Sequence, residues 1–290
     1  MSLMVKEYVV GMGDNVVDYY NNQNVKFPGG NAVNFSVFAP KTLVNSFYVG
    51  SLARDDDGDL ILESLKQEDV NTQFCNRIDG QTEKTFVNIV NGDRKFLDSV
   101  RGKRALPSLE DPKLLRLARE ALLVYSSCHS NSEKAIGKLH TNGSTIAYDF
   151  SEMGKYHSDE YLENVAKNVD IAQFSLSDSP VGDKERILET CTKVGTKFVL
   201  FTNGGEPPEL FDCRNDRKFV GQINYDPHPV DTMGAGDTFF SNLVVFMLSN
   251  EKELLEISDQ KINDALSFAA KAASQTIRRS GSYGYGKKIK

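Results

Sequence analysis

Four short apolar runs most constrain the fold of this 290-residue chain. They lie at residues 122–126, 145–150, 171–174 and 197–202, and helix-like segments at 131–141, 158–167 and 182–193 separate them. None of the runs alternates with polar residues, and strands of that kind are buried on both faces, as in a parallel sheet. The alternation of strand and helix therefore predicts an α/β protein with a mostly parallel sheet and helices on both sides.

Two segments depart from this alternation, residues 14–35 and residues 85–103. The second contains strand-like runs at 85–90 and 95–100, separated by Asn-Gly-Asp. Asn-Gly between two strands is a strong hairpin signal. We expect a single domain over residues 1–290, in which both segments leave the main sheet and form a small flap.

The composition excludes several classes of function. The formal net charge is −6 and the pI about 5.4, so no broad basic face for nucleic acid or a membrane surface is expected. No apolar run reaches the ~18 residues of a membrane span, and the first residues lack a signal-peptide pattern, so we expect a cytoplasmic protein. The 4 cysteines and 4 histidines are dispersed, which favours reduced thiols over a zinc site.

The most informative segment is Asp-Thr-Met-Gly-Ala-Gly-Asp-Thr-Phe at residues 231–239, which precedes an apolar helix at 239–248. Its glycines permit a tight turn and close approach of a ligand. The first N–H groups of a helix have no internal partners, and the helix dipole adds positive charge, so the turn predicts an anion hole suited to a phosphoryl group. Asp237, in the first helical turn, is placed to accept a proton from an attacking hydroxyl. Gly-Ala-Gly-Asp alone would fit a plain turn equally well, but the full string is more specific.

This segment resembles the C-terminal signature of the ribokinase-type (PfkB) carbohydrate kinases. The segment from Gly29 to Asn34, GGNAVN, resembles their glycine-glycine substrate motif, and that from Gly13 to Asp18, GDNVVD, their first-strand motif. The motifs occur in the family's order and the resemblance covers nearly the whole chain. It implies a ribokinase-like three-layer sandwich with a small β lid, and transfer of a phosphoryl group from ATP, with Mg²⁺, to a sugar hydroxyl.

The resemblance also implies roles for single residues. Asp237 would be the base, and the amides of Gly234, Ala235 and Gly236 would form the anion hole. A monovalent cation, potassium, would lie near Asp231. The lid would exclude water and join two copies in a homodimer. The substrate would be contacted by Asp14, Gly29, Gly30, Asn31 and Asn34.

One further resemblance narrows the chemical class of the acceptor substrate. GDNVVD followed by FPGGNAVN is most similar to kinases of fructoselysine, which implies a sugar-amine acceptor. Arg101 follows the predicted hairpin and is either part of a solvated basic loop or a bidentate ligand of a carboxylate or phosphate on the substrate. In the second case the acceptor would be an acidic amine adduct or a phosphosugar.

Two family motifs are altered. The Asn-x-x-Glu motif associated with magnesium is absent from residues 174–180, where Asp178 is the candidate substitute, acting through water. The nucleotide loop, usually Thr-x-Gly-x-x-Gly, reads Thr-Asn-Gly-Gly-Glu-Pro. Thr202 and Gly204 are in place, Pro207 occupies the last glycine position, and Gly205 is a partial replacement.

Two alternatives remain open. A nucleoside or vitamin kinase of the same fold would need an aromatic stacking surface, for which Phe27, Phe86 and Phe96 are available. A sugar-binding regulatory protein without turnover would fit the missing Asn-x-x-Glu motif, but the intact glycines and Asp237 argue against it.

Overall fold

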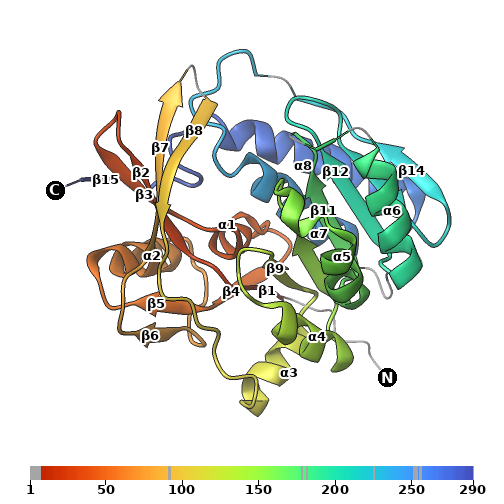
Figure 1. The fold of residues 1–290 in the computed structure, drawn as a ribbon, viewed down its shortest axis with the longest axis horizontal. Helices are drawn as coiled ribbons and strands as arrows, with labels where there is room; N and C mark the ends of the chain where they lie inside the picture. The colour runs from red at the N-terminus through yellow and green to blue at the C-terminus, as the bar shows by residue number, and fades with distance from the viewer. Residues whose placement is uncertain are drawn as a thin grey trace.

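A large sheet runs through the centre of the molecule, as the computed structural model shows for residues 8–90, 93–177, 179–180, 182–224, 226–250, 254 and 257–289 (Figure 1). Its strands lie in the order β14-β13-β12-β11-β10-β9-β1-β4. The strands from β4 to β12 pair in parallel, and β13 and β14 extend one edge antiparallel. Their bounds are β1 Tyr8–Met12, β4 Asn45–Val49, β9 Val124–Ser127, β10 Ile146–Asp149, β11 Ile171–Ser175, β12 Phe198–Thr202, β13 Glu209–Asp212 and β14 Arg217–Val220.

Helices cover both faces of this sheet. Successive residues of one strand enter different cores: Val9 packs with α1, α2, α7 and α8, whereas Val10 packs with α3, α4, α5 and α6. This double burial explains the lack of polar alternation, and it confirms the predicted three-layer α/β architecture. The helices are α1 Asn31–Phe38, α2 Asp56–Gln67, α3 Pro112–Glu120, α4 Glu133–Thr141, α5 Asp159–Val165, α6 Asp183–Val194, α7 Ala235–Leu248 and α8 Asp259–Thr276, with short 3₁₀ turns η1 Gly154–Tyr156 and η2 Ala166–Asn168.

A second, smaller sheet stands beside the first (Figure 1). Its order is β15-β3-β2-β7-β8, with β2 parallel to β7 and the other pairs antiparallel. Its strands are β2 Val16–Tyr20, β3 Val25–Gly29, β7 Glu83–Val90, β8 Asp93–Val100 and β15 Lys287–Lys288. The two departing segments thus supply β2, β3, β7 and β8. Helix α1, at the end of the first segment, packs instead on the large sheet, and the Asn-Gly of the predicted turn lies outside the described residues.

Two consecutive strands belong to different sheets. β4 lies in the large sheet, whereas the next strand, β5 Ser51–Ala53, pairs with β6, Asn76–Ile78. The break falls at Gly50, where a Cβ atom would lie 2.3 Å from the Tyr48 hydroxyl and 2.7 Å from the Gly13 carbonyl oxygen. Only glycine permits this close approach. None of the helices within the described ranges combines the length and apolar character that crossing a bilayer requires.

Candidate active site

Helix α7 begins at a turn that the glycines make possible. Gly234 has φ 77° at the N-cap, in the left-handed region, and a Cβ there would lie 2.6 Å from the Ser282 Cβ. The amide of Ala235 donates to the Thr232 carbonyl at 3.3 Å. Gly236 is exposed, and the nearest atom to a Cβ there would be the Gln173 Nε2 at 4.0 Å. The first helical turn is therefore open to an anion on the Gly236 side.

Asp237 lies in this first turn and is half-buried. Its Oδ2 accepts a hydrogen bond of 2.7 Å from the Asn34 Nδ2, and the Asn34 Oδ1 accepts one of 2.9 Å from Ser282. Burial raises the pKa of Asp237 to about 6, while the Asn34 bond acts against this rise. A carboxylate with that pKa is still largely ionised at neutral pH and is a stronger base than an ordinary aspartate.

Asp14 is buried and fully engaged with the protein. Its Oδ2 accepts from the amide of Asn31 at 2.7 Å, and its Oδ1 from the amide of Ala32 at 3.3 Å. The hydroxyls of Ser130 and Ser127 also donate to Oδ1, at 2.8 and 3.1 Å. The side chain thus binds the first amides of α1, where negative charge is favoured. The expected contact with a substrate hydroxyl remains a prediction.

The glycine pair before α1 brings this helix close to the loop after β1. Gly30 has φ 109°, and a Cβ there would lie 2.7 Å from the Asn15 Cα. A Cβ on Gly29 would lie 2.9 Å from the Asp18 Oδ2. Asn31, the first residue of α1, donates from Nδ2 to the Asp149 Oδ2 at 3.2 Å. The predicted substrate motif and Asp237 therefore converge, since Asn34 bonds Asp237 from the next turn of α1.

Asp149 and Gln173 join this group although sequence reasoning did not select them. They lie on the neighbouring strands β10 and β11, and the Gln173 Nε2 is 3.5 Å from the Asp149 Oδ2. Burial, followed by the charge of Asp237, raises the pKa of Asp149 to about 7. Their position toward the carboxyl ends of parallel strands, where open α/β sheets bind ligands, was the available clue.

These two side chains fit a magnesium–nucleotide group. The Gln173 Oε1 is buried and has no hydrogen-bond partner among the described residues, and it stands beside the open turn of α7. Oxygen donors of this kind, with water between, suit Mg²⁺. Asp178, the predicted substitute for the altered motif, lies outside the described residues. Within them, no group of three or more His, Cys, Asp or Glu side chains could hold a metal ion.

Asp231 connects three separate parts of the chain. Its Oδ2 accepts from the Tyr20 hydroxyl at 2.6 Å and from the Gly281 amide at 2.7 Å, and its Oδ1 from the Met233 amide at 2.9 Å. The residue is 1% exposed. With three donors on its two oxygens, the carboxylate links the small sheet to the start of α7, and the monovalent cation expected near Asp231 stays a prediction.

The small sheet also brings an unpredicted arginine to the site. Arg94, on β8, donates from Nη1 to both the carbonyl and the hydroxyl oxygen of Thr232, each at 3.2 Å. The neighbouring Asp93 accepts from the Thr232 hydroxyl at 3.1 Å. Arg101, for which the sequence left a solvated loop and an anion contact both open, is exposed just after β8, where its carbonyl accepts from Gln81 at 3.2 Å.

A small hollow lies next to Asp14. Arg104 borders it, bonded through its guanidinium to the Glu83 carboxylate and the His129 carbonyl. The remaining lining comes from the loop after β1, from Ser51 and Ser130, and from Ala105 and Leu106. Because polar groups converge there, it is the candidate site of contact with the acceptor.

The predicted nucleotide loop follows β12. The Thr202 carbonyl accepts from the Leu176 amide at 2.8 Å. Gly204, with φ 51°, and Gly205 are exposed, and a Cβ on either would meet no atom within 4 Å. This loop is exposed to solvent at the carboxyl end of the large sheet.

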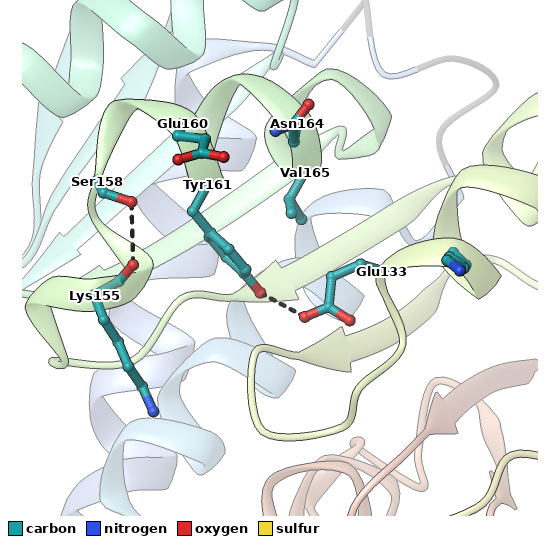
Figure 2. A pocket seen from close by; sticks show the side chains of 8 residues that line it. Glu133, Lys155, Ser158, Glu160, Tyr161, Asn164 and Val165 are labelled. Carbon is teal, nitrogen blue, oxygen red and sulfur yellow. Dashed lines mark hydrogen bonds between the residues drawn. The ribbon is translucent and has the colours of Figure 1, made fainter.

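A wider hollow occurs between α4 and α5 (Figure 2). Tyr161 points across it and donates to Glu133 at 2.9 Å, and Ser158 donates to the Lys155 carbonyl at 3.2 Å. None of the predicted site residues lines it. The larger cavity therefore does not coincide with the cluster around Asp237, and the chemistry of the residues points to the latter.

Comparisons with known proteins identify the family of this chain. A model of the pfkB family of carbohydrate kinases matches residues 2–287. Fructosamine kinase FrlD of Bacillus subtilis is 31% identical over 286 residues, which cover 96% of this chain and 93% of the relative. Fructoselysine 6-kinase of Escherichia coli is 28% identical over 235 residues, covering 80% and 86%.

Solved structures share the fold. A fructokinase from Xylella fastidiosa with bound ATP aligns with TM-score 0.79 at 16% identity, covering 97% of this chain and 95% of its own. Arabidopsis thaliana ribokinase, complexed with ribose and ATP, aligns with TM-score 0.73 at 20% identity, covering 97% and 96%. The fold is thus ribokinase-like, as predicted, and with a family match over almost its full length the chain belongs to the pfkB family of carbohydrate kinases.

Proposed function

We propose that this carbohydrate kinase transfers the γ-phosphoryl group of ATP to a hydroxyl of a fructosamine, a sugar-amine adduct of the fructoselysine type. The observation that carries the proposal is Asp237, held by Asn34 at the open first turn of α7. The printed names of the relatives, fructosamine kinase and fructoselysine 6-kinase, support the acceptor class.

In this mechanism Asp237 accepts the proton of the acceptor hydroxyl as its oxygen attacks the γ-phosphorus. The amides at the start of α7, including that of Gly236, stabilise the charge on the transferred group. General-base assistance of this kind contributes about 10²–10⁴ in rate. Magnesium, when bound with ATP, neutralises phosphate charge, and Asp149 and Gln173 would hold it through water. Thr202, Gly204 and Gly205 would border the nucleotide.

The acceptor would bind across the mouth of the hollow beside Asp14 and Arg104, which by itself has room for only about one water molecule. Gly29, Gly30 and Asn31 would shape its wall, and the small sheet would close over it and exclude water. Arg104, already paired with Glu83, is better placed than Arg101 to border the hollow. Arg101 remains a candidate contact only for a long acceptor that extends past β8.

The arrangement of aromatic rings disfavours a nucleoside acceptor. Phe27 is 6% exposed and packs on Tyr20, with ring centroids 4.9 Å apart. Phe86 packs on Tyr19, on the side of the small sheet that faces α2. Phe96 is 55% exposed on β8. Neither of the two inner rings is free to stack on a base.

The small sheet also supports a homodimer. Its edge strand β8 exposes Phe96 and Leu97, at 55% and 54%. Exposed apolar residues on an unpaired edge favour association with a second copy. Sedimentation of the wild type and of Phe96→Glu tests this, since a dimer through β8 should dissociate in the variant and a monomeric wild type would contradict it.

The main test is magnesium-dependent ADP release from ATP with fructoselysine, other fructosyl amino acids, fructose, ribose and nucleosides. We expect the fructosamines to give the highest kcat/KM, and Asp237→Asn to lower it by about 10²–10⁴ without loss of ATP binding. A preference for nucleosides would overturn the acceptor class. Binding of ATP and sugar without any turnover would favour a regulatory protein.

A further inference from the structure

Arg94 is anchored to the same turn that opens the anion hole. Its Nη1 donates to the Thr232 carbonyl oxygen at 3.2 Å, and this oxygen also accepts the Ala235 amide at 3.3 Å. The guanidinium and the first amide of α7 therefore share one acceptor. Arg94 comes from β8, far along the chain, so the small sheet carries a positive charge to the start of α7.

The guanidinium is held without being neutralised. Its Nε is buried and has no hydrogen-bond partner among the described residues. Within the same residues no carboxylate lies within ion-pair distance of Arg94, and the contacts with Thr232 use Nη1 alone. A buried donor without a partner is unfavourable, and more so when it is charged, so an anion is the partner that this group lacks.

The charge of Arg94 already acts on the site. It lowers the pKa of Asp237 and of Asp18, against the larger effect of burial. Asp18 is 6% exposed on β2. The guanidinium thus lies among carboxylates at the point where phosphoryl transfer would add further negative charge.

Resting on the kinase function proposed above, we propose that Arg94 is a catalytic residue whose guanidinium binds the phosphoryl group during transfer. In this step the bond between the γ-phosphorus and the oxygen of ADP breaks and a bond to the acceptor oxygen forms. The acceptor proton passes to Asp237. Arg94 and the amide of Gly236 share the charge on the equatorial phosphoryl oxygens. Because Arg94 lies on the small sheet, the site is complete only when this sheet covers α7.

Two other roles for Arg94 make different predictions. As a latch it would only hold the small sheet to Thr232, a role it would share with Asp93. As a substrate anchor it would bind a carboxylate of the acceptor. Only the phosphoryl role requires a loss of kcat with every acceptor.

The test compares Arg94→Ala and Arg94→Lys with Lys95→Ala, which removes the adjacent, exposed positive charge, and with Asp93→Asn, which weakens the latch. For Arg94→Ala we expect kcat to fall by about 10²–10³ with fructose-like and carboxylate-bearing acceptors alike, and KM to stay within a few-fold. Added guanidinium should restore part of the activity. The acid limb of kcat/KM should move to higher pH, because Arg94 lowers the pKa of Asp237. Lys95→Ala should match the wild type.

Binding of ADP with aluminium fluoride, a mimic of the transferred phosphoryl group, provides a second measurement that needs no turnover. Arg94→Ala should lose affinity for this complex and keep that for ADP alone. Equal affinities, a loss limited to carboxylate-bearing acceptors, or an equal loss in Asp93→Asn would each overturn the phosphoryl role. If the wild type turned over no acceptor, the kinase proposal would fail first, whereas an active wild type with unimpaired Arg94 variants would contradict this inference alone.

Discussion

Each face of the small sheet adjoins a buried aspartate, and the two aspartates differ in their partners. On the face toward α2, Asp57 is 3% exposed and accepts bonds from Tyr19, Lys26 and Lys84. On the face toward α7, Asp18 is 6% exposed, but no hydrogen bond to its carboxylate occurs within the described residues, and burial raises its pKa to about 7. From this comparison we expect the paired cluster to contribute to stability and the unpaired one to serve ligand binding.

The largest expected effect on stability comes from removing the Asp57 carboxylate. Asp57→Ala leaves Lys26 and Lys84 without their acceptor in a mostly buried place, so we expect a loss of about 3 kcal/mol in the free energy of unfolding. Urea denaturation measures this. Asp56→Ala is the matched control, since Asp56 is exposed in the same helical turn. Unchanged stability in Asp57→Ala would show that the cluster contributes nothing.

The residues around the start of α7 differ in how far the sequence could predict them. Gly234, Gly236 and Asp237 lie within one contiguous string, and the geometry of a helix start follows from it. Asn34 and Asp237 meet across two helices, and only the family resemblance indicated that they belong together. Arg94 could not be selected, because the register of β7 with β8 decides which residue faces α7, and this register shifts between Phe86 and Val87.

Two side chains have partners that their motifs did not indicate. The oxygens of Asp14 accept from the start of α1 and from two serines, and Asp231 accepts from Tyr20 of the small sheet. The expected substrate contact of Asp14 and the expected cation near Asp231 stay predictions. In both cases the partner lies far away in sequence, so residue type and motif position do not reveal it.

Neutralising Asp18 should raise the free energy of unfolding, whereas Asp57→Ala should lower it. Because the pKa of Asp18 is raised in the folded state, its protonated form stabilises the fold at low pH, and this contribution is lost as pH rises from about 4 to about 7. Asp18→Asn should therefore raise the free energy of unfolding by about 2 kcal/mol at pH 8, with little change at pH 4. A destabilised variant at pH 8 would mean that the ionised carboxylate has a partner in the folded protein.

The pH profile of activity tests the role of Asp237 as the base. Asp237 must be ionised to accept a proton, and burial raises its pKa to about 6. We expect kcat/KM to fall about tenfold per pH unit below pH 6. Asn34→Ala removes the bond that lowers the pKa of Asp237, so its acid limb should lie at higher pH. A wild-type profile that stays flat to pH 4.5 would exclude Asp237 as the base.

The smallest effect on stability is expected for Tyr19, because Asp57 accepts from other donors as well. Tyr19 donates to both oxygens of Asp57, at 2.8 and 3.1 Å, while two lysines neutralise the same carboxylate. Tyr19→Phe should cost about 1 kcal/mol, the net value of one hydrogen bond, because the ring still packs on Phe86 and the carboxylate keeps both cations. Urea denaturation of Tyr19→Phe, Asp57→Ala and the double variant separates the two contributions. If the tyrosine acts only through Asp57, the double variant should lose no more than Asp57→Ala, and additive losses would show that the hydroxyl stabilises the sheet by another contact.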